Sequence, residues 1–304
     1  MVDPALVNTL VFSGIAAMSS VGLTLTYLTT RVPNFAHGSF LTVGAYVAVY
    51  WAQILQRSPY EVVWASALLS GLVSVTQYKV VLNPLRRRGA SPTYQMIATL
   101  TVAFFIFGVM SILADYFGRT YKVRTSYIAL RAFDPEIMSI PLVTLLSLAS
   151  VILSTILLYI FLNKTRTGVA LRASIENPEL AQVLGINIER MYMLAWFIAG
   201  SLGGFAGLMY AMWLPVTTTA GDEFLPTIFA SSILGGLSSI FGSLAGGILV
   251  GAANSLIPQM IAALGFTEII QYRPIIPLLI MSIVLLTVPE GITSLAMKWV
   301  RSSR

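Results

Sequence analysis

The sequence predicts an all-α, polytopic membrane protein, and its composition and its span pattern together carry this prediction. Of its 304 residues, 57% are hydrophobic and only 10% are charged, and the mean hydropathy is +0.83. Soluble proteins are usually about 25% charged, and a soluble fold this poor in charge could not cover its own surface. So high an apolar content also excludes disorder. We therefore expect residues 1–304 to form a single transmembrane domain.

Hydrophobic stretches recur along the chain at lengths that suit membrane crossing. One spanning helix needs about 20 residues, and on this scale we interpret the sequence as nine crossings. The seventh and ninth are short, as expected of half-helices or of steep crossings that are shielded by protein. The nine crossings are residues 6–29, 33–55, 60–81, 94–114, 139–162, 191–213, 224–239, 243–262 and 275–289.

The basic residues predict how the chain is oriented in the cell membrane. With the N-terminus outside, 12 of the 18 Lys and Arg residues fall on the cytoplasmic side, in agreement with the positive-inside rule. Loop 115–138, with four basic residues, argues against this orientation. The cluster Arg86, Arg87 and Arg88 lies in a short loop, so it is stronger evidence for this orientation than loop 115–138 is against it. We expect Arg87, Ser174 and the C-terminus in the cytoplasm, and Thr125 outside.

The first four and the last four crossings match in their spacing. A shift of 185 residues places Phe12 on Phe197 and Gly22 on Gly207. The first crossing runs inward and the sixth runs outward, so the halves would be inverted repeats, which are a transporter architecture. The predicted halves are residues 6–114 and 191–297, joined by span 139–162 and the cytoplasmic loop 163–190.

A short helix is predicted inside loop 163–190. Asn177 is a good N-cap, Pro178 fits the first helical position, Glu179 suits the positive helix start, and Gly185 is a typical C-terminal stop. So short a helix is not stable alone, so its apolar side must pack on something. Two alternatives are open: a connecting loop that lies on the membrane, or a helix that docks on a soluble partner. The apolar side consists of Leu180, Ala181, Val183 and Leu184.

Glycines recur at four-residue spacing in the sixth and eighth crossings. Close packing of helices is the default explanation for such pairs. It requires no ligand. The pairs are Gly200/Gly204, Gly203/Gly207, Gly242/Gly246 and Gly247/Gly251.

Two further stretches are candidates for a pathway or gate. The run 235–239 interrupts the hydrophobic pattern, and irregular backbone is tolerated at membrane depth where it is buried or lines a cavity. His37 starts the second crossing, where Asn34 would cap the helix and His37 would bond a freed carbonyl. A role in the pathway is the alternative. Proton coupling is not expected, because the spans offer no acidic partner. The candidates are Asn34, His37, Gly38, Gly235, Gly236, Ser238 and Ser239.

Four blocks of sequence carry a resemblance to a known family. They include Asn-Phe-Ala-His-Gly at 34–38, the segment 167–187, Leu-Gly-Gly-Leu-Ser at 234–238, and Val-Pro-Glu-Gly-Ile at 288–292. In this order they resemble the branched-chain amino acid permeases of ATP-binding-cassette importers, the high-affinity leucine, isoleucine and valine system. The resemblance covers roughly residues 10–293 and is greatest to the shorter of the two permeases that pair there.

The resemblance implies a non-catalytic subunit that works with partners in a lipid membrane and not with nucleic acid. The chain contains no G-x-x-x-x-G-K-[ST] phosphate loop, so ATP and Mg would bind to partner subunits and no cofactor to this chain. The implied partners are two ATP-binding-cassette ATPase subunits, a second permease subunit and an extracytoplasmic solute-binding protein.

The resemblance also implies that helix 176–185 sits in a groove on an ATPase subunit. A stiff helix there would transmit ATPase closure as a rigid-body movement. Glu189 and Arg190 would add contacts at the rim. The residues implied in this coupling are Arg172, Glu176, Asn177, Pro178, Glu179, Leu180, Ala181, Leu184 and Gly185.

We therefore expect an importer of branched-chain or related apolar amino acids, with Asp222 and Glu223 as outer-face contacts for the binding protein. One alternative is a permease of the same architecture for urea, short amides or an aromatic acid. A secondary transporter or channel is disfavoured, because we find no intramembrane acid and no ring of filter residues. An intramembrane enzyme would need a nucleophile–base pair or metal ligands, and the chain has no cysteine and one histidine.

Overall fold

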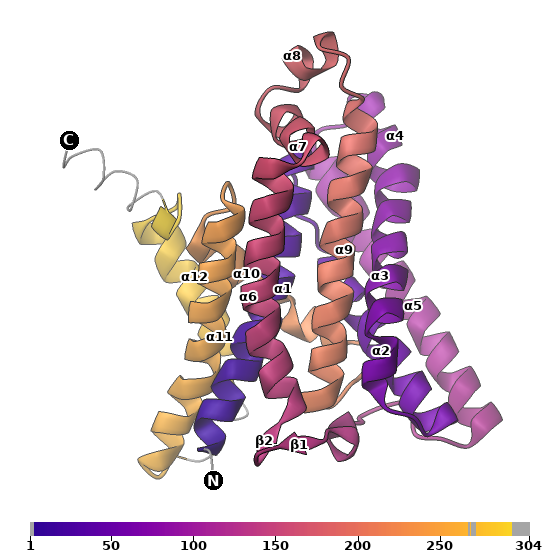
Figure 1. The fold of residues 1–304 in the computed structure, drawn as a ribbon, viewed down its shortest axis with the longest axis vertical. Helices are drawn as coiled ribbons and strands as arrows, with labels where there is room; N and C mark the ends of the chain where they lie inside the picture. Colours follow the sequence, from indigo (N-terminus) through magenta and orange to yellow (C-terminus); the bar gives the residue numbers. More distant parts are fainter. Residues whose placement is uncertain (1–2, 267, 269–271, 294–304) are drawn as a thin grey trace.

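The computed structural model describes residues 3–266, 268 and 272–293, which form a bundle of helices (Figure 1). Seven of the described helices are long and apolar enough to cross a membrane. The predicted all-α membrane fold is therefore confirmed. The seven are α1 (Pro4–Thr30), α2 (His37–Leu55), the segment Pro59–Arg87 with α3 (Val63–Gln77) at its centre, α5 (Pro92–Tyr121), α6 (Leu142–Lys164), α9 (Ile188–Trp213) and α11 (Ile240–Ala263).

The two crossings that were predicted to be short correspond to α10 (Ala220–Gly235) and α12 (Ile275–Thr287). They have 16 and 13 residues, fewer than the roughly 20 of a full crossing, so nine crossings stay a prediction. The remaining elements are short: η1 (Pro59–Val62), a π-helical turn η2 (Tyr78–Leu82), α4 (Asn83–Arg87), η3 (Leu130–Phe133), the antiparallel strands β1 (Glu136–Ile137) and β2 (Ile140–Pro141), α7 (Arg166–Glu176) and α8 (Pro178–Val183).

The helices pack in a pattern that pairs the two ends of the chain. α1 and α9 pack against each other at the centre; α1 also packs on α11, and α9 packs on α3. Further contacts come in the same kind of pairs, α2 with α3 and α10 with α11, then α2 with α5 and α10 with α12. Two inverted halves related by a two-fold axis would give this pattern. The repeats stay a prediction, and their second half extends into residues 294–297, outside the described residues.

Small residues allow the central helices to approach closely. A Cβ atom added to Gly200 or Gly204 would collide with α3, and one added to Gly203 or Gly207 would meet α2. In α11, an added Cβ at Gly247 or Gly251 would collide with the backbone of α1, and one at Gly242 or Gly246 would collide with the end of α10. All eight glycines of the predicted pairs thus lie where two helices meet, with no ligand required.

The helix of the second crossing begins near the middle of the bundle rather than at its end. Residues 31–36 leave α1 and run back along it without helical structure, so that His37 starts α2 beside Ser19, in the middle of α1. α10 starts in the same way, because the chain turns back after Trp213. The two helix starts touch where Gly38 meets Gly221, whose missing side chains permit backbone contact.

Asp222 and Glu223, predicted at the outer face, lie instead level with the middle of the bundle. They belong to the first turn of α10, and Asp222 shares a small cleft with Ile106 and Met110 from the middle of α5. This corrects two expectations: the helix predicted from 224 begins at Ala220, and acidic side chains lie at mid-height in the bundle. Hydropathy placed these residues in an outer loop. It depends only on residue type, so it cannot show that the chain after α9 turns back into the bundle.

Candidate functional site

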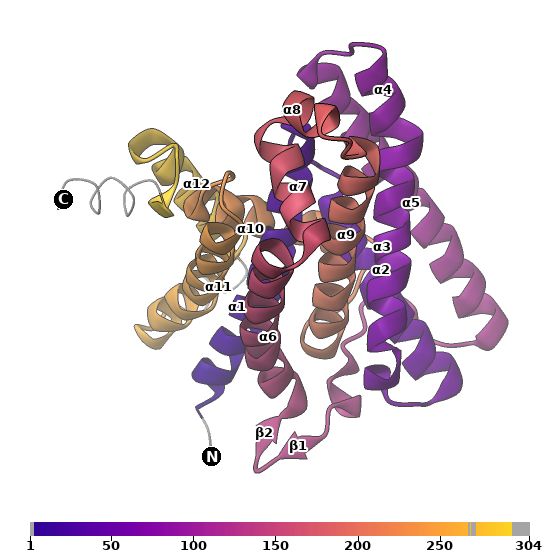
Figure 2. The same ribbon diagram turned by 45° about the horizontal axis from the view of Figure 1, so that its top comes forward.

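The predicted coupling segment forms two helices that project beyond the bundle (Figures 1 and 2). Thr165 caps α7 by accepting a hydrogen bond from the Gly168 amide at 3.0 Å, and Asn177 caps α8 by accepting one from the Leu180 amide at 3.0 Å. α8 ends at Val183, and Gly185, two residues later, turns the chain away with a φ of +81° that favours glycine. Local capping chemistry thus accounts for the ends of both helices.

Most of the apolar side of α8 has no cover in this chain. Leu180, Val183 and Leu184 are 56%, 83% and 71% exposed, whereas Ala181 is buried. Glu179 lies in the first turn of α8, whereas Arg172 and Glu176 lie in α7, where Arg172 donates to Asn163 and lies 3.8 Å from Glu176. A row of exposed leucine-sized side chains on a projecting helix is typical of a surface that another protein covers.

The segment is fastened to the bundle at its base. Glu189 pairs with Arg87 and accepts a hydrogen bond from Asn83 at 2.8 Å. Tyr192 of α9 donates to the Ser174 carbonyl at 3.1 Å. Glu189, expected as a rim contact for the ATPase, is thus engaged with α4. These bonds connect α9 with α4 and with α7.

The start of α2 holds a cluster of buried polar side chains. His37 Nε2 donates to the Ser19 carbonyl at 2.9 Å, and Asn34 accepts hydrogen bonds from the Ala36 amide at 3.1 Å and from Gln77 at 2.9 Å. Asn34 was expected to cap α2, but it does not, because Ala36 occupies the N-cap position. Among the described residues, Asn34 Nδ2, His37 Nδ1 and Gln77 Oε1 have no hydrogen-bond partner.

The run 235–239 is the turn between α10 and α11. Gly236 takes φ +97°, and Ser239 caps α11 by accepting from the Gly242 amide at 3.0 Å. Thr293 donates to the Gly235 carbonyl at 2.8 Å, and the Ser238 side chain is exposed. The break in the hydrophobic pattern is thus explained by a helix stop followed by a helix cap.

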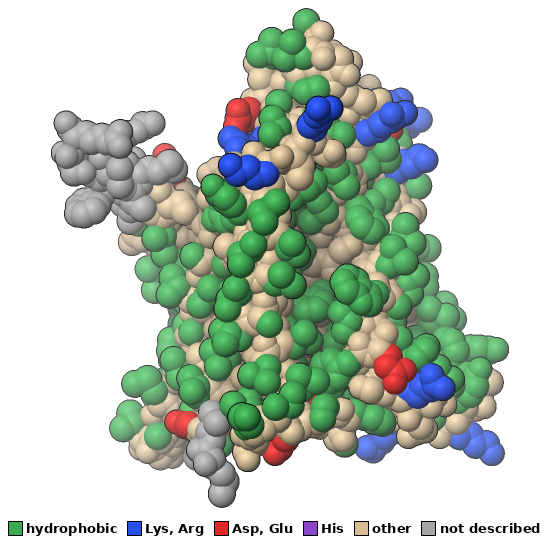
Figure 3. All heavy atoms as spheres, in the orientation of Figure 1, with side chains coloured by type: hydrophobic (Ala, Val, Ile, Leu, Met, Phe, Trp, Pro, Cys, Tyr) green, Lys and Arg blue, Asp and Glu red, His purple; other side chains and the backbone are tan. Residues whose placement is uncertain are grey.

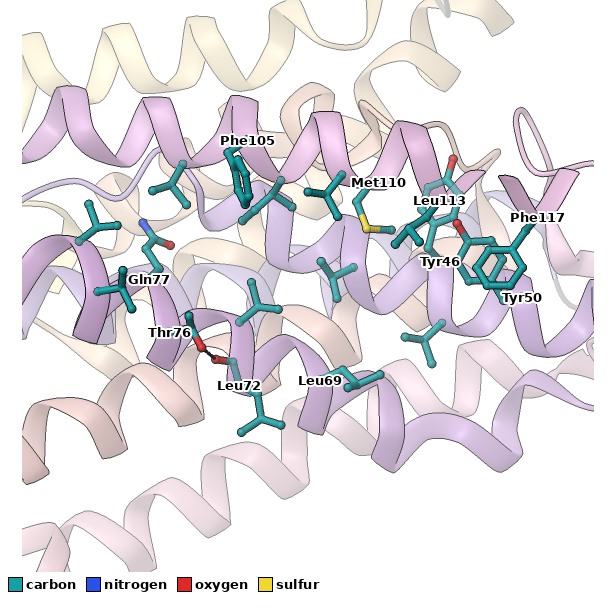
Figure 4. Close-up of a pocket in the computed structure, with 18 residues that line it drawn as sticks. Tyr46, Tyr50, Leu69, Leu72, Thr76, Gln77, Phe105, Met110, Leu113 and Phe117 are labelled. Carbon is teal, nitrogen blue, oxygen red and sulfur yellow. Dashed lines mark hydrogen bonds between the residues drawn. The ribbon is translucent and has the colours of Figure 1, made fainter. Parts of the chain in front are cut away.

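A groove of about 750 Å³ lies between α2, α3 and α5 (Figure 4). Gln77 stands at one end of it, and Tyr46, Tyr50 and Phe117 stand at the other, with the Tyr50 and Phe117 rings 4.5 Å apart. Apart from the tyrosine hydroxyls, Thr76 and Gln77, its wall is hydrocarbon. Sequence analysis missed this groove and the place of Gln77, because side chains from three separate helices line it.

The end of the bundle opposite α8 carries a folded loop. The backbone at Ile128 pairs with that at Val216, which joins loop 115–138 to the segment after α9. Arg131 stacks over Trp213 at 4.1 Å, and Tyr60 donates to Asp134 at 2.6 Å. Partial burial raises the pKa of the Asp134 carboxyl above its ordinary value, although these hydrogen bonds oppose the shift. Loop 115–138 and the segment that follows α9 therefore form one surface at this end of the bundle.

Comparison with known proteins identifies the architecture. The model of the family described as branched-chain amino acid transport system / permease component matches residues 5–288. The chain belongs to this family. It is therefore a multi-pass membrane permease subunit of an ATP-binding-cassette importer, as the resemblance implied, and such permeases work with ATPase and binding-protein partners.

Curated relatives match along nearly the whole chain. A probable branched-chain amino acid transport permease protein, LivH, of Methanocaldococcus jannaschii is 36% identical over 95% of this chain and 91% of its own length. LivH of Escherichia coli, a high-affinity branched-chain amino acid transport system permease protein, is 24% identical over 91% and 90%. A galactose/methyl galactoside import permease protein of Haemophilus influenzae is 25% identical over 88% and 82%. No solved structure matches the chain significantly.

Proposed function

We propose that the chain moves branched-chain or related apolar amino acids into the cell. The observation that carries this proposal is the match with a relative named for branched-chain amino acid transport over 95% of the chain. The apolar groove beside Gln77 supports it, since hydrocarbon walls suit an aliphatic side chain. The polar cluster of Asn34, His37 and Gly38 and the turn 235–239 are candidate gate elements on either side of the central helices.

The proposed complex contains two ATPase subunits, a second permease subunit and an extracytoplasmic binding protein. ATP and Mg bind to the ATPase subunits, and this chain contributes no catalytic group. The exposed leucines of α8 support an ATPase contact, and loop 115–138, joined to the segment around Val216, supports a docking surface for the binding protein. The permease transmits closure of the ATPase pair to the spanning helices through α7, α8 and the Arg87–Glu189 pair.

Transport by the reconstituted complex tests this function. The chain is expressed with ATPase, second-permease and binding-protein partners, and the complex is placed in vesicles. We expect ATP-dependent uptake of leucine, isoleucine and valine that requires the binding protein. Galactose, urea and nucleosides should not compete. Uptake of one of these solutes in place of leucine would reassign the substrate, and uptake without ATP would contradict an importer of this class.

We further propose that the N-terminus and loop 115–138 face outward and α8 faces the cytoplasm. Hydrophobic side chains cover the middle of the molecule, and Lys and Arg side chains gather toward both ends (Figure 3). The 12-to-6 division of the basic residues supports this choice of sides. Lys298, Arg301 and Arg304, which contribute to it, lie outside the described residues.

Single cysteines test this orientation, since the natural chain has none. Ser174 is buried and Thr125 donates to the Ala114 carbonyl, so the exposed Val183 and Ser126 are better sites. We expect an impermeant thiol reagent, added to intact cells, to label Ser126→Cys at once and Val183→Cys only after the cells are opened. Labelling of Val183→Cys from outside would reverse the orientation.

A further inference from the structure

Acidic side chains occur at the level where lipid would surround a membrane protein. Asp222 lines a small cleft with Ile106 and Met110, which lie in the middle of α5. Gly221 touches Gly38 at the start of α2, beside the middle of α1. Asp222 is therefore far from both ends of the spanning helices.

Both Asp222 and Glu223 are exposed in the isolated chain. An ionised carboxylate that faces lipid is costly, and acidic side chains in membrane spans face the protein interior or a water-filled cavity. The face that carries Asp222 is consequently covered by another subunit or by an aqueous pathway in the assembled transporter.

Most of the backbone amides at the start of α10 are already engaged. The Ala220 amide donates to the Thr217 carbonyl at 3.1 Å, the Gly221 amide donates to Thr42 Oγ1 at 2.9 Å, and the Glu223 amide donates to the Thr219 carbonyl at 2.9 Å. The Asp222 side chain adds carboxylate oxygens, which accept hydrogen bonds. This side chain therefore suits a cation with N–H donors.

A second polar side chain points into the same cleft without a partner. Ser39, in the first turn of α2, is only 3% exposed and lines the cleft with Asp222. No described residue forms a hydrogen bond with its hydroxyl. Its hydroxyl is therefore free to accept a hydrogen bond, and a ligand with N–H donors would bind it together with Asp222.

The cleft is too narrow for a water molecule in this structure. We propose that it opens during transport and that Asp222 and Ser39 then bind the α-ammonium group of an amino acid in transit. This assignment rests on the proposed function, because it specifies how the same substrate is recognised inside the membrane. Ile106 and Met110 also line the large apolar groove, so an aliphatic side chain lies along hydrocarbon while its ammonium group meets Asp222. The site selects zwitterionic amino acids against apolar solutes without an amine.

Leucine uptake by vesicles that contain the whole complex tests the assignment. We expect Asp222→Asn to lower the initial rate by about 10- to 100-fold, the range for one hydrogen bond to a charged group, and Asp222→Glu to retain more uptake. The matched control is Asp115→Asn, because Asp115 is 61% exposed and pairs with Arg119 near the end of α5. ATPase stimulation by the binding protein should persist in Asp222→Asn, since its docking surface is untouched.

The outcomes separate this assignment from the proposed function. If the natural complex takes up no branched-chain amino acid, the proposed function fails. If the natural complex takes up leucine and Asp222→Asn matches it, only the ammonium site fails. If Asp222→Asn loses the second permease on purification, Asp222 contacts the partner rather than the substrate, and the assignment is overturned.

Accessibility to water provides a measurement that does not depend on transport. A cysteine in place of Asp222 is expected to react with a water-soluble, positively charged thiol reagent in the assembled complex, and leucine with ATP should slow the reaction. The control is Phe104→Cys, at similar depth on α5 and 67% exposed, which should stay unlabelled because it faces lipid. An unreactive cysteine at position 222 would exclude an aqueous pathway at this face.

Discussion

Replacing Leu180 and Leu184 by alanine is expected to abolish uptake while the permease stays folded and inserted. The two side chains are four residues apart on α8, on one side of the helix. Both are more than half exposed, so they add little to the packing of their own chain. The helix start does not depend on them, because Asn177 caps it and Ala181 is the residue that packs inward.

The expected loss is large because each leucine would be an apolar anchor in the ATPase groove. Burial of one leucine contributes about 1.5–3 kcal/mol, so the pair would weaken docking by roughly 10²- to 10⁴-fold. The measurement is co-purification of the ATPase subunits with the permease, together with uptake by reconstituted vesicles. The binding protein should still engage the opposite end of the bundle.

Leu153 and Leu157 of α6 provide the matched control. They are also four residues apart and are 56% and 55% exposed, but they lie on a spanning helix rather than on the projecting segment. Leu153→Ala/Leu157→Ala should leave co-purification and uptake near normal. If the α8 variant also behaved normally, the segment would be only a connecting loop that lies on the membrane, and the proposed coupling would be lost.

Gly246→Leu is expected to prevent assembly of a folded complex. An added Cβ at Gly246 would stand 2.6 Å from the Gly235 amide nitrogen and still closer to the Ser231 carbonyl. Backbone cannot move aside as a flexible side chain does, so α10 and α11 would have to separate. Overpacking of a well-packed core costs about 1–3 kcal/mol and occasionally more, and a collision with backbone on a neighbouring helix belongs to the upper end.

The yield of monodisperse complex in detergent measures this effect. Gly108→Leu is the matched control, because an added Cβ at Gly108 on α5 would meet nothing within 4 Å. We expect a normal yield for Gly108→Leu and little or no folded complex for Gly246→Leu. A fully assembled and active Gly246→Leu complex would show that α10 and α11 do not need close contact.

Local signals in the sequence were enough to predict the short helix in the proposed coupling segment. Asn177, Pro178 and Gly185 act on backbone groups within a few residues, so their types alone predicted where α8 begins and ends. Hydropathy located the long crossings for a similar reason, because a bilayer acts on each stretch of about 20 residues separately. The spacing of Gly246 and its fellow glycines predicted close contacts, but not which helices they join.

The depth of Asp222 in the bundle and the presence of the groove depend on tertiary structure. Acidic residues after a hydrophobic stretch are typical of an outer loop, and nothing near Asp222 in the chain shows that Gly221 meets Gly38. The groove is likewise lined by hydrocarbon side chains that would face lipid if each helix stood alone. The sequence by itself determined the fold class, the family and the ends of α8, because those depend on local chemistry. The depth of Asp222, the partners of His37 and the polar end of the groove depend on contacts between residues far apart in the chain, which only the packed helices specify.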